Sequence, residues 1–286
     1  MKVAVVGASG QLGCDLVSTF AGSGHEVFAL SHGQIEIADL DSVVNTLRTL
    51  QPDLVVNTAA MHHVENCEMQ PEKAYLINAL GARNLALAVR DMGSVLIHVS
   101  TDYVFDGAKG RPYQESDSPR PLSVYGNTKL AGEYFVSTTL DKYFVVRTSA
   151  IYGTHPCRAK GMNFIDLMLK LAREREEVHV VEDEVVTPTS TAELARQMLV
   201  LSNSDCFGLY HATAEGDCSW FEFAQTIFSL TNTKVKLKPA APGEFPAKVP
   251  RPKYSVLENQ VLKSRELNIF SPWQDGLRQY LQQRGV

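Results

Sequence analysis

Three side chains of this sequence have the types and spacing needed to move a proton: Tyr125, Lys129 and, upstream, Thr101. Residues i and i+4 of a helix share a face, so we predict that the Tyr125 phenol and the Lys129 ammonium lie one turn apart. A neighbouring ammonium lowers the pKa of a tyrosine from its ordinary value of about 10. Tyr125 is therefore predicted to be a general acid or base, with Lys129 lowering its pKa. The spacing alone is also typical of a partly exposed helix face.

The segment VSTDYVFDG at residues 99–107 places polar side chains directly after an apolar run. Ligands bind at the carboxyl ends of strands in parallel sheets. The Thr101 hydroxyl is predicted to donate to a substrate carbonyl oxygen as charge develops on it, beside Tyr125. A strand-end hydroxyl bonded to local backbone is the simpler alternative. Asp102 is predicted either to orient a sugar hydroxyl or to cap the loop.

A glycine-rich segment, GASGQLG at residues 7–13, lies between the first apolar run and the first helical pattern. Gly7 allows a tight turn, Gly10 lets the backbone approach a pyrophosphate, and Gly13 permits close packing of helix on strand. The start of the following helix offers amide donors and the positive end of its dipole to phosphates. This segment predicts a dinucleotide site.

The end of the second predicted strand bears on the choice of nicotinamide cofactor. Ser31 and His32 stand where an acidic residue would grip the ribose 2′-hydroxyl and repel a 2′-phosphate. Because no acidic residue is present there to repel a 2′-phosphate, we favour NADPH. No arginine is present to bind that phosphate either, so NADH stays open. Asp39 and Leu40 are predicted to contact the adenine edge, with a helix-capping Asp39 as the alternative. The small residues of segment 57–60, NTAA, let a cofactor lie against the backbone.

Composition narrows the class of protein. The chain has 286 residues, 44% hydrophobic and 21% charged, with a formal charge of -5. That charge argues against a nucleic-acid surface, which needs clustered Lys and Arg, and no apolar run approaches the roughly 20 residues that span a bilayer. The five scattered cysteines form no zinc spacing and fit reduced thiols. His62 and His63, with Cys67 nearby, have no further ligand at a useful spacing, so no metal site is predicted. The protein is expected to be cytoplasmic.

The first half of the chain alternates two kinds of pattern. Apolar β-branched runs lie at residues 3–6, 27–30, 54–57, 95–100 and 144–147, and helical patterns lie at 12–22, 42–50, 72–92 and 124–138. This alternation predicts βαβ units and an α/β fold with a doubly wound parallel sheet, a Rossmann domain over residues 1–153.

The second half is more irregular. Helices are predicted at 163–177, which ends in a charge run, and at 191–201, 219–230 and 271–281, with a proline-rich irregular stretch at 239–252. Ser219 and Glu222 form a capping-box pattern. We predict that residues 154–286 form mainly a smaller substrate-binding lobe, with part of 187–204 returning to the first domain.

Taken together, these motifs resemble the extended short-chain dehydrogenase/reductase superfamily and, more narrowly, the dTDP-4-dehydrorhamnose reductase family. The resemblance covers nearly the whole chain in the family's order. It rests on STDYVFDG (100–107), YGNTKLAGE (125–133), RTSAIYG (147–153), TPTSTAEL (187–194), GLYH (208–211), CSWFEF (218–223), RPKYSVL (251–257) and Asn163-Phe164.

The resemblance implies reduction of the 4-keto group of dTDP-4-dehydro-6-deoxy-L-mannose by NAD(P)H, giving dTDP-L-rhamnose. It makes Tyr125 the acid/base, lets Lys129 bind the nicotinamide ribose, and places Thr101, Asp102 and Arg251 on the substrate. The cofactor contacts so implied, together with the glycine turn, are Gly7, Gly10, Gln11, Leu12, Gly13, Asp39, Leu40, Ala60, Met61, Tyr125 and Lys129.

Some positions depart from the family pattern. Ala150 stands where the family commonly has tryptophan, and Glu184-Val185-Val186 replace glutamine, an aromatic or aliphatic residue, and glycine. These changes leave the sugar and its nucleotide open. Family members use carboxylate-bound Mg²⁺ to bridge dimers, but Gln282-Gln283-Arg284 offers no equivalent, so Mg²⁺ and a homodimer rest on resemblance alone. Two alternatives to a reductase stay open for the function of this chain. One is an epimerase or dehydratase on the same scaffold, and the other is a non-catalytic dinucleotide-binding regulatory subunit.

Overall fold

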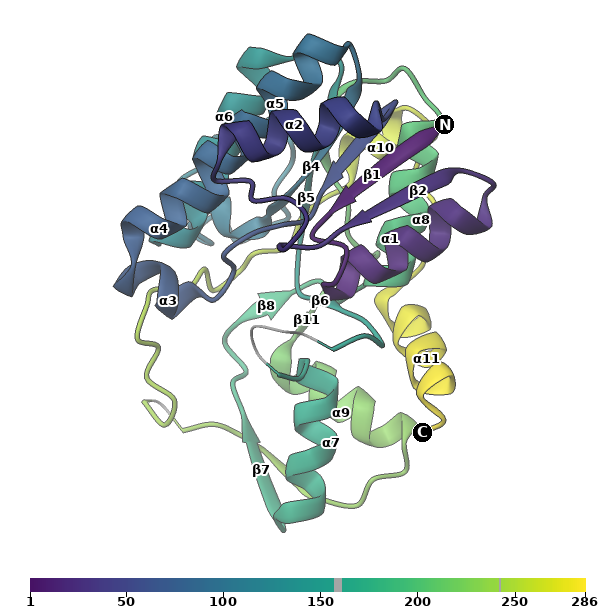
Figure 1. Ribbon diagram of the computed structural model, residues 1–286. Helices are drawn as coiled ribbons and strands as arrows, with labels where there is room; N and C mark the ends of the chain where they lie inside the picture. Colours follow the sequence, from purple (N-terminus) through teal and green to yellow (C-terminus); the bar gives the residue numbers. More distant parts are fainter. Residues whose placement is uncertain (157–160, 242) are drawn as a thin grey trace.

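A six-stranded parallel sheet forms the centre of the computed structural model, which describes residues 1–156, 161–241 and 243–286 (Figure 1). The strand order is β10-β5-β4-β3-β1-β2, and every neighbouring pair is parallel. The strands are β1 (Lys2–Val6), β2 (Glu26–Leu30), β3 (Leu54–Asn57), β4 (Val95–Thr101), β5 (Tyr143–Thr148) and β10 (Gly208–His211). The predicted doubly wound α/β fold is confirmed.

Helices cover both faces of this sheet, which explains why the central strands are almost continuously apolar. One face packs against α1 (Gln11–Gly22), α8 (Thr191–Ser202) and α10 (Gln260–Ser264). The other packs against α2 (Leu40–Leu50), α5 (Gly81–Met92) and α6 (Val124–Thr139). Because β1 lies between β2 and β3, the direction of winding reverses there. In sheets of this kind, ligands bind beside such a point, outside the carboxyl ends of the strands.

The predicted helix at 72–92 is interrupted. It divides into α4 (Pro71–Tyr75), a π-helical turn η1 (Leu76–Leu80) and α5, and a short α3 (Val64–Met69) precedes it. Proline at the first position of α4 suits a helix start because its missing N–H has no intrahelical partner there. These helices and α6 form the left side of the sheet domain in Figure 1.

The remaining elements build a smaller lobe below the sheet in Figure 1. They are α7 (Phe164–Glu174), α9 (Trp220–Leu230), α11 (Trp273–Arg284) and the strand pairs β6 (Ile151–Tyr152) with β9 (Thr189–Ser190), β7 (Glu177–Val180) with β12 (Lys236–Pro239), and β8 (Val185–Val186) with β11 (Cys218–Ser219). Tyr152, Phe223 and Trp273 lie in its separate hydrophobic core. The capping box of Ser219 and Glu222 at the start of α9 is present as predicted.

Two details of the lobe differ from the sequence expectation. The charge run at 173–177 is not wholly helical, because Arg175 has extended backbone and Glu177 opens β7. Glu177 there pairs with Lys236 and Lys238 of the adjacent β12. The proline-rich stretch is not entirely irregular either, since Pro239 closes β12. In both places strand pairing decides the backbone.

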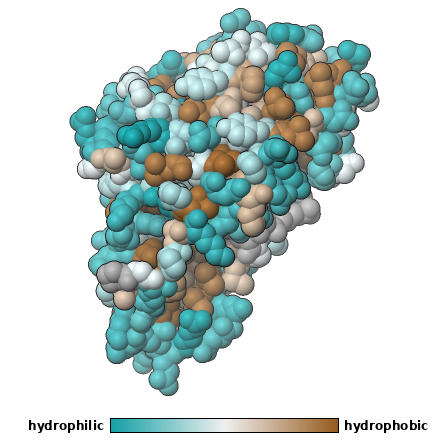
Figure 2. Space-filling model, turned by 90° about the vertical axis from the view of Figure 1, so that its left-hand side faces the viewer, coloured by the Kyte–Doolittle hydropathy of each residue, from teal (hydrophilic) through white to brown (hydrophobic). Residues whose placement is uncertain are grey.

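The division of the chain near residue 153 stays a prediction, and α8 is described with the sheet because it packs against α1. None of the described helices is long and apolar enough to cross a membrane. Exposed hydrophobic side chains include Met69, Tyr75, Leu76 and Leu80 on the helices from α3 to η1. Figure 2 shows the left-hand face of the molecule, where hydrophobic patches alternate with hydrophilic ones. Cys157 lies outside the described residues, and Cys67, Cys206 and Cys218 are free thiols.

Candidate active site

Tyr125 is placed by the start of α6, next to the end of β4. Ser123 caps this helix, and its Oγ accepts from the Gly126 amide at 3.2 Å. A Cβ at Gly126 would overlap the Tyr103 carbonyl oxygen, so glycine lets the helix start lie against the loop after β4. The rings of Tyr103 and Tyr125 meet edge to face, with centroids 5.9 Å apart.

The Thr101 hydroxyl and the Asp102 carboxylate form one buried cluster beneath Tyr125. Thr101 Oγ1 donates to Asp102 Oδ1 at 3.0 Å and accepts from the Tyr103 amide at 3.2 Å. Ser149 Oγ donates to the other carboxylate oxygen of Asp102 at 2.9 Å. Burial raises the pKa of Asp102, and these hydroxyl donors oppose the rise. Thr101 thus makes the local hydrogen bonds expected of an ordinary hydroxyl at the end of a strand. The same hydroxyl also interacts with Tyr125.

The pKa of Tyr125 differs from the expectation. Burial raises it above 10, the nearby Asp102 raises it further, and only the Thr101 hydroxyl acts to lower it. Lys129, expected to lower it, is directed elsewhere: its Nζ donates to the Val99 carbonyl at 2.6 Å. Burial lowers the pKa of Lys129 itself to about 8, against the attraction of Glu133. In the protein alone, the phenol is therefore held in its protonated form, ready to donate.

Behind Lys129 lies a buried ion pair. Arg147 of β5 donates to Glu133 of α6 through Nε and Nη2, with Nη2 2.6 Å from Oε2. Ser100 Oγ donates to the same carboxylate at 2.5 Å, and the Arg147 guanidinium lies over the Phe105 ring. These contacts tie α6, which carries Tyr125, to the ends of β4 and β5.

The glycine turn has the geometry that the sequence predicts. Gly7 has φ +80°, and a Cβ there would lie 2.7 Å from Thr58 Oγ1. A Cβ at Gly13 would overlap the Gly7 carbonyl oxygen, so α1 lies directly on the turn. Gly10 has more room, since its nearest neighbour in that direction is 3.4 Å away. No side chain caps α1 at Gly10, which leaves the first amides of the helix available to phosphates.

The other predicted cofactor contacts lie along the same carboxyl edge. Ala60 and Met61 follow β3, and the Met61 amide donates to Asn78 Oδ1 at 2.8 Å. Asp39 caps α2 by accepting from the amides of Asp41 and Ser42, and Leu40 is exposed beside it. The Leu12 side chain is buried in the core. The Gln11 side chain instead donates to the carbonyls of residues 153 and 155, so it ties the turn to the chain that leaves β6.

The tip of β2 holds a feature that the local sequence did not reveal. Ser31 Oγ donates to Gln34 Oε1 at 2.8 Å, which folds the chain back. The exposed His32 then lies 3.4 Å from the Glu36 carboxylate. The turn after the strand therefore brings the Glu36 carboxylate beside His32.

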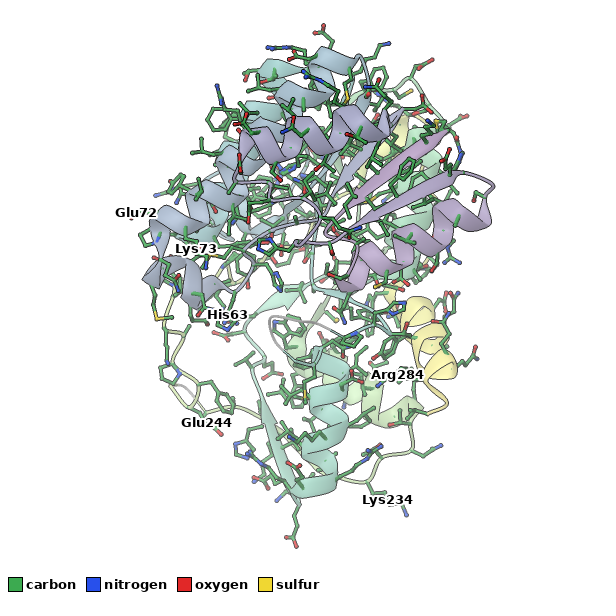
Figure 3. The ribbon with its side chains drawn as sticks, in the orientation of Figure 1. His63, Glu72, Lys73, Lys234, Glu244 and Arg284 are labelled. Atoms are coloured by element: carbon green, nitrogen blue, oxygen red, sulfur yellow. The ribbon has the colours of Figure 1, made fainter. Side chains whose placement is uncertain are left out.

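Arg251 reaches the site from the long connection between β12 and α10. Its Nη2 donates to Glu65 Oε1 of α3 at 2.8 Å, so the pair links residues far apart in sequence. His63, 3.3 Å from the same carboxylate, lies at the lower end of α3, toward the lobe (Figure 3). Burial raises the pKa of Glu184, and the attraction of Arg251 opposes the rise. Burial raises the pKa of the Tyr103 phenol, and the nearby Arg251 opposes this rise.

Ala150 marks the passage from the sheet into the lobe. Its φ is +44°, which is unusual for a residue with a Cβ. Its carbonyl accepts from the Thr189 amide at 3.3 Å, a bond that continues the pairing of β6 with β9. Hydrogen bonding to β9 therefore holds this residue in a left-handed conformation at the edge of the site.

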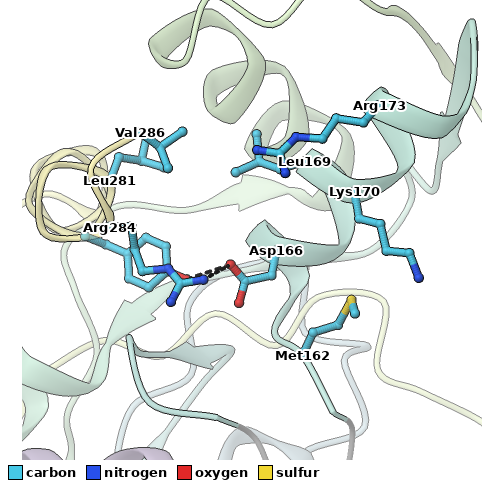
Figure 4. A pocket seen from close by; sticks show the side chains of 9 residues that line it. Met162, Asp166, Leu169, Lys170, Arg173, Leu281, Arg284 and Val286 are labelled. Atoms are coloured by element: carbon cyan, nitrogen blue, oxygen red, sulfur yellow. Dashed lines mark hydrogen bonds and ion pairs between the residues drawn. The ribbon is translucent and has the colours of Figure 1, made fainter.

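A separate depression of about 330 Å³ lies between α7 and α11 (Figure 4). None of the predicted site residues lines it. Arg284, in the C-terminal segment considered for a metal, pairs there with Asp166 at 3.2 Å, and the Tyr280 phenol donates to the same carboxylate. Within the described ranges, no group of three or more His, Cys, Asp or Glu side chains is arranged to hold a metal ion.

Several side chains around Lys129 were missed from the sequence. Asn57 and His98 lie on the adjacent strands β3 and β4, and His98 reaches Lys129. Ser100, Glu133 and Arg147 lie within the family motifs, but no role of their own was predicted for them. Their apolar surroundings are a usable signal, since a polar side chain inside a buried strand requires a partner.

Comparison with known proteins places this geometry in context. The model of the RmlD substrate binding domain family matches residues 1–285. The spore coat polysaccharide biosynthesis protein SpsK of Bacillus subtilis is 39% identical, over 99% of this chain and 98% of its own. A dTDP-4-dehydrorhamnose reductase of Sinorhizobium fredii is 35% identical, over 97% and 96%.

Solved structures agree. A dTDP-4-dehydrorhamnose reductase from Clostridium acetobutylicum superposes with a TM-score of 0.95 at 40% identity and covers 100% of both chains. A dTDP-4-dehydrorhamnose reductase from Bacillus anthracis, solved in complex with NADP, gives 0.94 at 36% identity over 99% of each chain. Both relatives match the sheet and the lobe together.

Proposed function

We propose that this chain, which belongs to the RmlD substrate binding domain family, is an NAD(P)H-dependent reductase of a nucleotide-activated 4-keto-6-deoxy sugar. The observation that carries the proposal is the meeting of the Tyr125 phenol with the Thr101 hydroxyl at the carboxyl end of β4. This pair lies at the same edge of the sheet as the glycine turn. Proton donors beside a dinucleotide site are what carbonyl reduction requires.

The substrate that we propose is dTDP-4-dehydrorhamnose, with dTDP-L-rhamnose as product. Support comes from the relatives named dTDP-4-dehydrorhamnose reductase, which match nearly the full length of the chain. The half-buried Arg251 and Glu184 form a polar group beside Tyr103, suited to the hydroxyl and phosphate groups of a sugar nucleotide. We also propose a cytoplasmic location, and a homodimer remains a prediction.

The residues present fit a nicotinamide dinucleotide. Gly7 and Gly13 bring backbone and helix together where a Cβ would clash, and the uncapped start of α1 faces the turn. We propose NADPH as the preferred cofactor, supported by the NADP bound to the Bacillus anthracis relative. When bound, the reduced nicotinamide supplies the hydride. Lys129 is proposed to hold its ribose.

The chain's own residues then handle the proton. Tyr125 is protonated because burial raises its pKa, so its phenol can donate to the carbonyl oxygen of the sugar as negative charge develops there. Thr101 is proposed to donate to the same oxygen, by turning its hydroxyl away from Asp102. Asp102, fixed by Ser149, keeps Thr101 in place until then.

A spectrophotometric assay of NADH and NADPH oxidation against dTDP-, UDP- and GDP-linked 4-keto-6-deoxy sugars tests the proposal. We expect stoichiometric oxidation of NADPH with dTDP-4-dehydrorhamnose and slower oxidation with the other carriers. Cofactor that survives purification and returns unconsumed after turnover indicates an epimerase or dehydratase instead. Tight cofactor binding with no turnover of any sugar nucleotide indicates a regulatory subunit.

A further inference from the structure

Asn57 and His98 form a buried polar pair in the middle of the sheet. They are directly opposite each other in the register of β3 and β4, and are 2% and 1% exposed. The Asn57 amide nitrogen lies 3.1 Å from His98 Nδ1. On the other side of the ring, His98 Nε2 lies 3.4 Å from Lys129 Nζ. The ring thus connects an asparagine to the lysine of the active site.

The backbone decides which way the Asn57 amide faces. Asn57 Oδ1 accepts from the Ala59 amide at 3.1 Å, so Nδ2 must be the group directed at the ring. Nδ2 can only donate, and His98 Nδ1 must therefore be the acceptor. Burial and the adjacent Lys129 lower the pKa of His98 well below its ordinary value, so the ring is neutral. A neutral ring with an unprotonated Nδ1 carries its hydrogen on Nε2.

This tautomer directs an N–H group at Lys129. An ammonium has only hydrogens to offer, and it cannot accept from His98 Nε2–H, whereas a neutral amine can. We propose that Asn57 and His98 are positioning residues that oppose the positive charge of Lys129, so that this lysine releases its proton more readily than an ordinary lysine. The two residues act on the site through Lys129.

The other groups around Lys129 leave this effect in place. Lys129 is 3% exposed, and its Nζ donates to the Val99 carbonyl of β4. Glu133 on the same helix is the nearest carboxylate, and it favours the charged form. That carboxylate is already occupied by Arg147 of β5 and by Ser100. Burial outweighs it and lowers the pKa of Lys129 to about 8.

Gly132 makes the contact between helix and strand close enough for this arrangement. A Cβ at Gly132 would lie 2.5 Å from the Asn78 carbonyl oxygen and 3.3 Å from His98 Nε2. The glycine therefore lets α6 lie directly against the imidazole. Lys129, one turn earlier, is brought to the ring by the same approach.

The consequence for turnover rests on the proposed function. A lysine that holds a ribose hydroxyl as an ammonium loses that role when it becomes an amine. The reductase is then expected to lose activity as the pH rises through about 8, where Lys129 releases its proton. Tyr125 gives no such loss there, because burial raises its pKa further.

Nuclear magnetic resonance on the whole chain without cofactor tests the inference apart from activity. The ¹⁵N shifts of the histidine rings distinguish the two tautomers, and His211 is an internal reference: its Nδ1 lies 3.0 Å from the Tyr113 carbonyl and must carry the hydrogen. We expect hydrogen on Nε2 of His98 and on Nδ1 of His211. Hydrogen on Nδ1 of His98 overturns the proposal.

The charge of Lys129 is followed in the same protein with [ε-¹³C]lysine, its signal assigned by its loss in Lys129→Met. Asn57→Asp offers a carboxylate to Nδ1–H, which moves the ring hydrogen and presents a lone pair to Lys129. We expect the pH midpoint of the Lys129 titration to rise by roughly one to three units, together with the change of tautomer in His98. His98→Gln removes the ring N–H and is expected to raise the midpoint by less.

His211→Gln is the matched control, because it replaces a buried histidine at a site that does not reach Lys129. The midpoint of the Lys129 titration in this variant should equal that of the unmodified protein. A Lys129 midpoint that stays fixed in both Asn57→Asp and His98→Gln contradicts the proposal. Folding of each variant is checked by its methyl spectrum. A protein that shows the predicted shifts but oxidises no NADPH keeps this inference and rejects the proposed function.

Discussion

The two sides of the candidate site are held in different ways. On the sheet side, Lys129, Glu133 and Arg147 are almost fully buried and are joined by hydrogen bonds across α6, β4 and β5. On the lobe side, Arg251 and Glu65 are about one-third exposed, and their ion pair joins a long connection to a short helix. Several elements fix the sheet side, which is proposed to handle the proton, whereas fewer contacts hold the lobe side, which is proposed to face the sugar.

This contrast explains where the chain departs from the family pattern. Ala150 and Glu184 both lie toward the lobe and are only partly buried. If this side faces the sugar as proposed, changes there would alter the shape and charge offered to it without disturbing the sheet. A change at Glu133, in contrast, would leave a buried guanidinium without its partner. We infer that substrate choice can vary on this scaffold while the chemistry stays fixed.

The largest effect on turnover is expected from Tyr125→Phe on the sheet side. Removal of the phenol leaves the Thr101 hydroxyl, a much weaker acid than a phenol, at the sugar oxygen, and kcat should fall by about 10²–10⁴-fold. The affinity for NADPH, measured by fluorescence titration, should be kept, because the glycine turn is untouched. Full activity in this variant would show that another group supplies the proton.

Glu133→Gln tests how firmly the sheet side is built. The change leaves Arg147 buried with no carboxylate, so we expect the free energy of unfolding to fall by about 3–5 kcal/mol. Urea denaturation followed by circular dichroism measures the difference. A loss below about 1 kcal/mol would mean that this buried pair is no stronger than a surface pair, and the contrast between the two sides would fail.

Arg251→Gln addresses the lobe side. If Arg251 binds the charged groups of the sugar nucleotide, its removal costs about 1.5–3 kcal/mol of binding, which corresponds to a rise in KM of roughly tenfold to a hundredfold. The affinity for NADPH should not change, and kcat should remain close to its original value. An unchanged KM would remove Arg251 from the substrate site.

Glu65→Gln makes the same chemical change as Glu133→Gln at the partly exposed pair of Arg251 and Glu65. Exposed ion pairs contribute little, so the free energy of unfolding should change by less than about 1 kcal/mol. The same urea experiment measures both variants side by side. Equal losses at the two positions would contradict the comparison drawn above.

The sequence predicted the first five strands of the central sheet, the glycine turn and α6 correctly, because their patterns are local, but it did not predict β10. It could not predict the contacts of His98 with Asn57, or of Arg147 with Glu133, since these depend on the register between strands and on how α6 lies over them. The direction of the Tyr125 pKa was missed for a related reason. Spacing shows the neighbour at Lys129 but not the burial that outweighs it.

The position of β10 in the chain has a consequence for synthesis. This strand pairs with β5 and completes the sheet edge, yet it follows the lobe elements α7 and β7 and the sheet-covering helix α8 in the sequence. A ribosome must therefore synthesise much of the lobe before β10 can complete the six-stranded sheet. During that interval the edge of β5 is unpaired, and such edges are prone to join other chains. A nascent chain stalled between β5 and β10 is therefore expected to aggregate more readily than the complete chain.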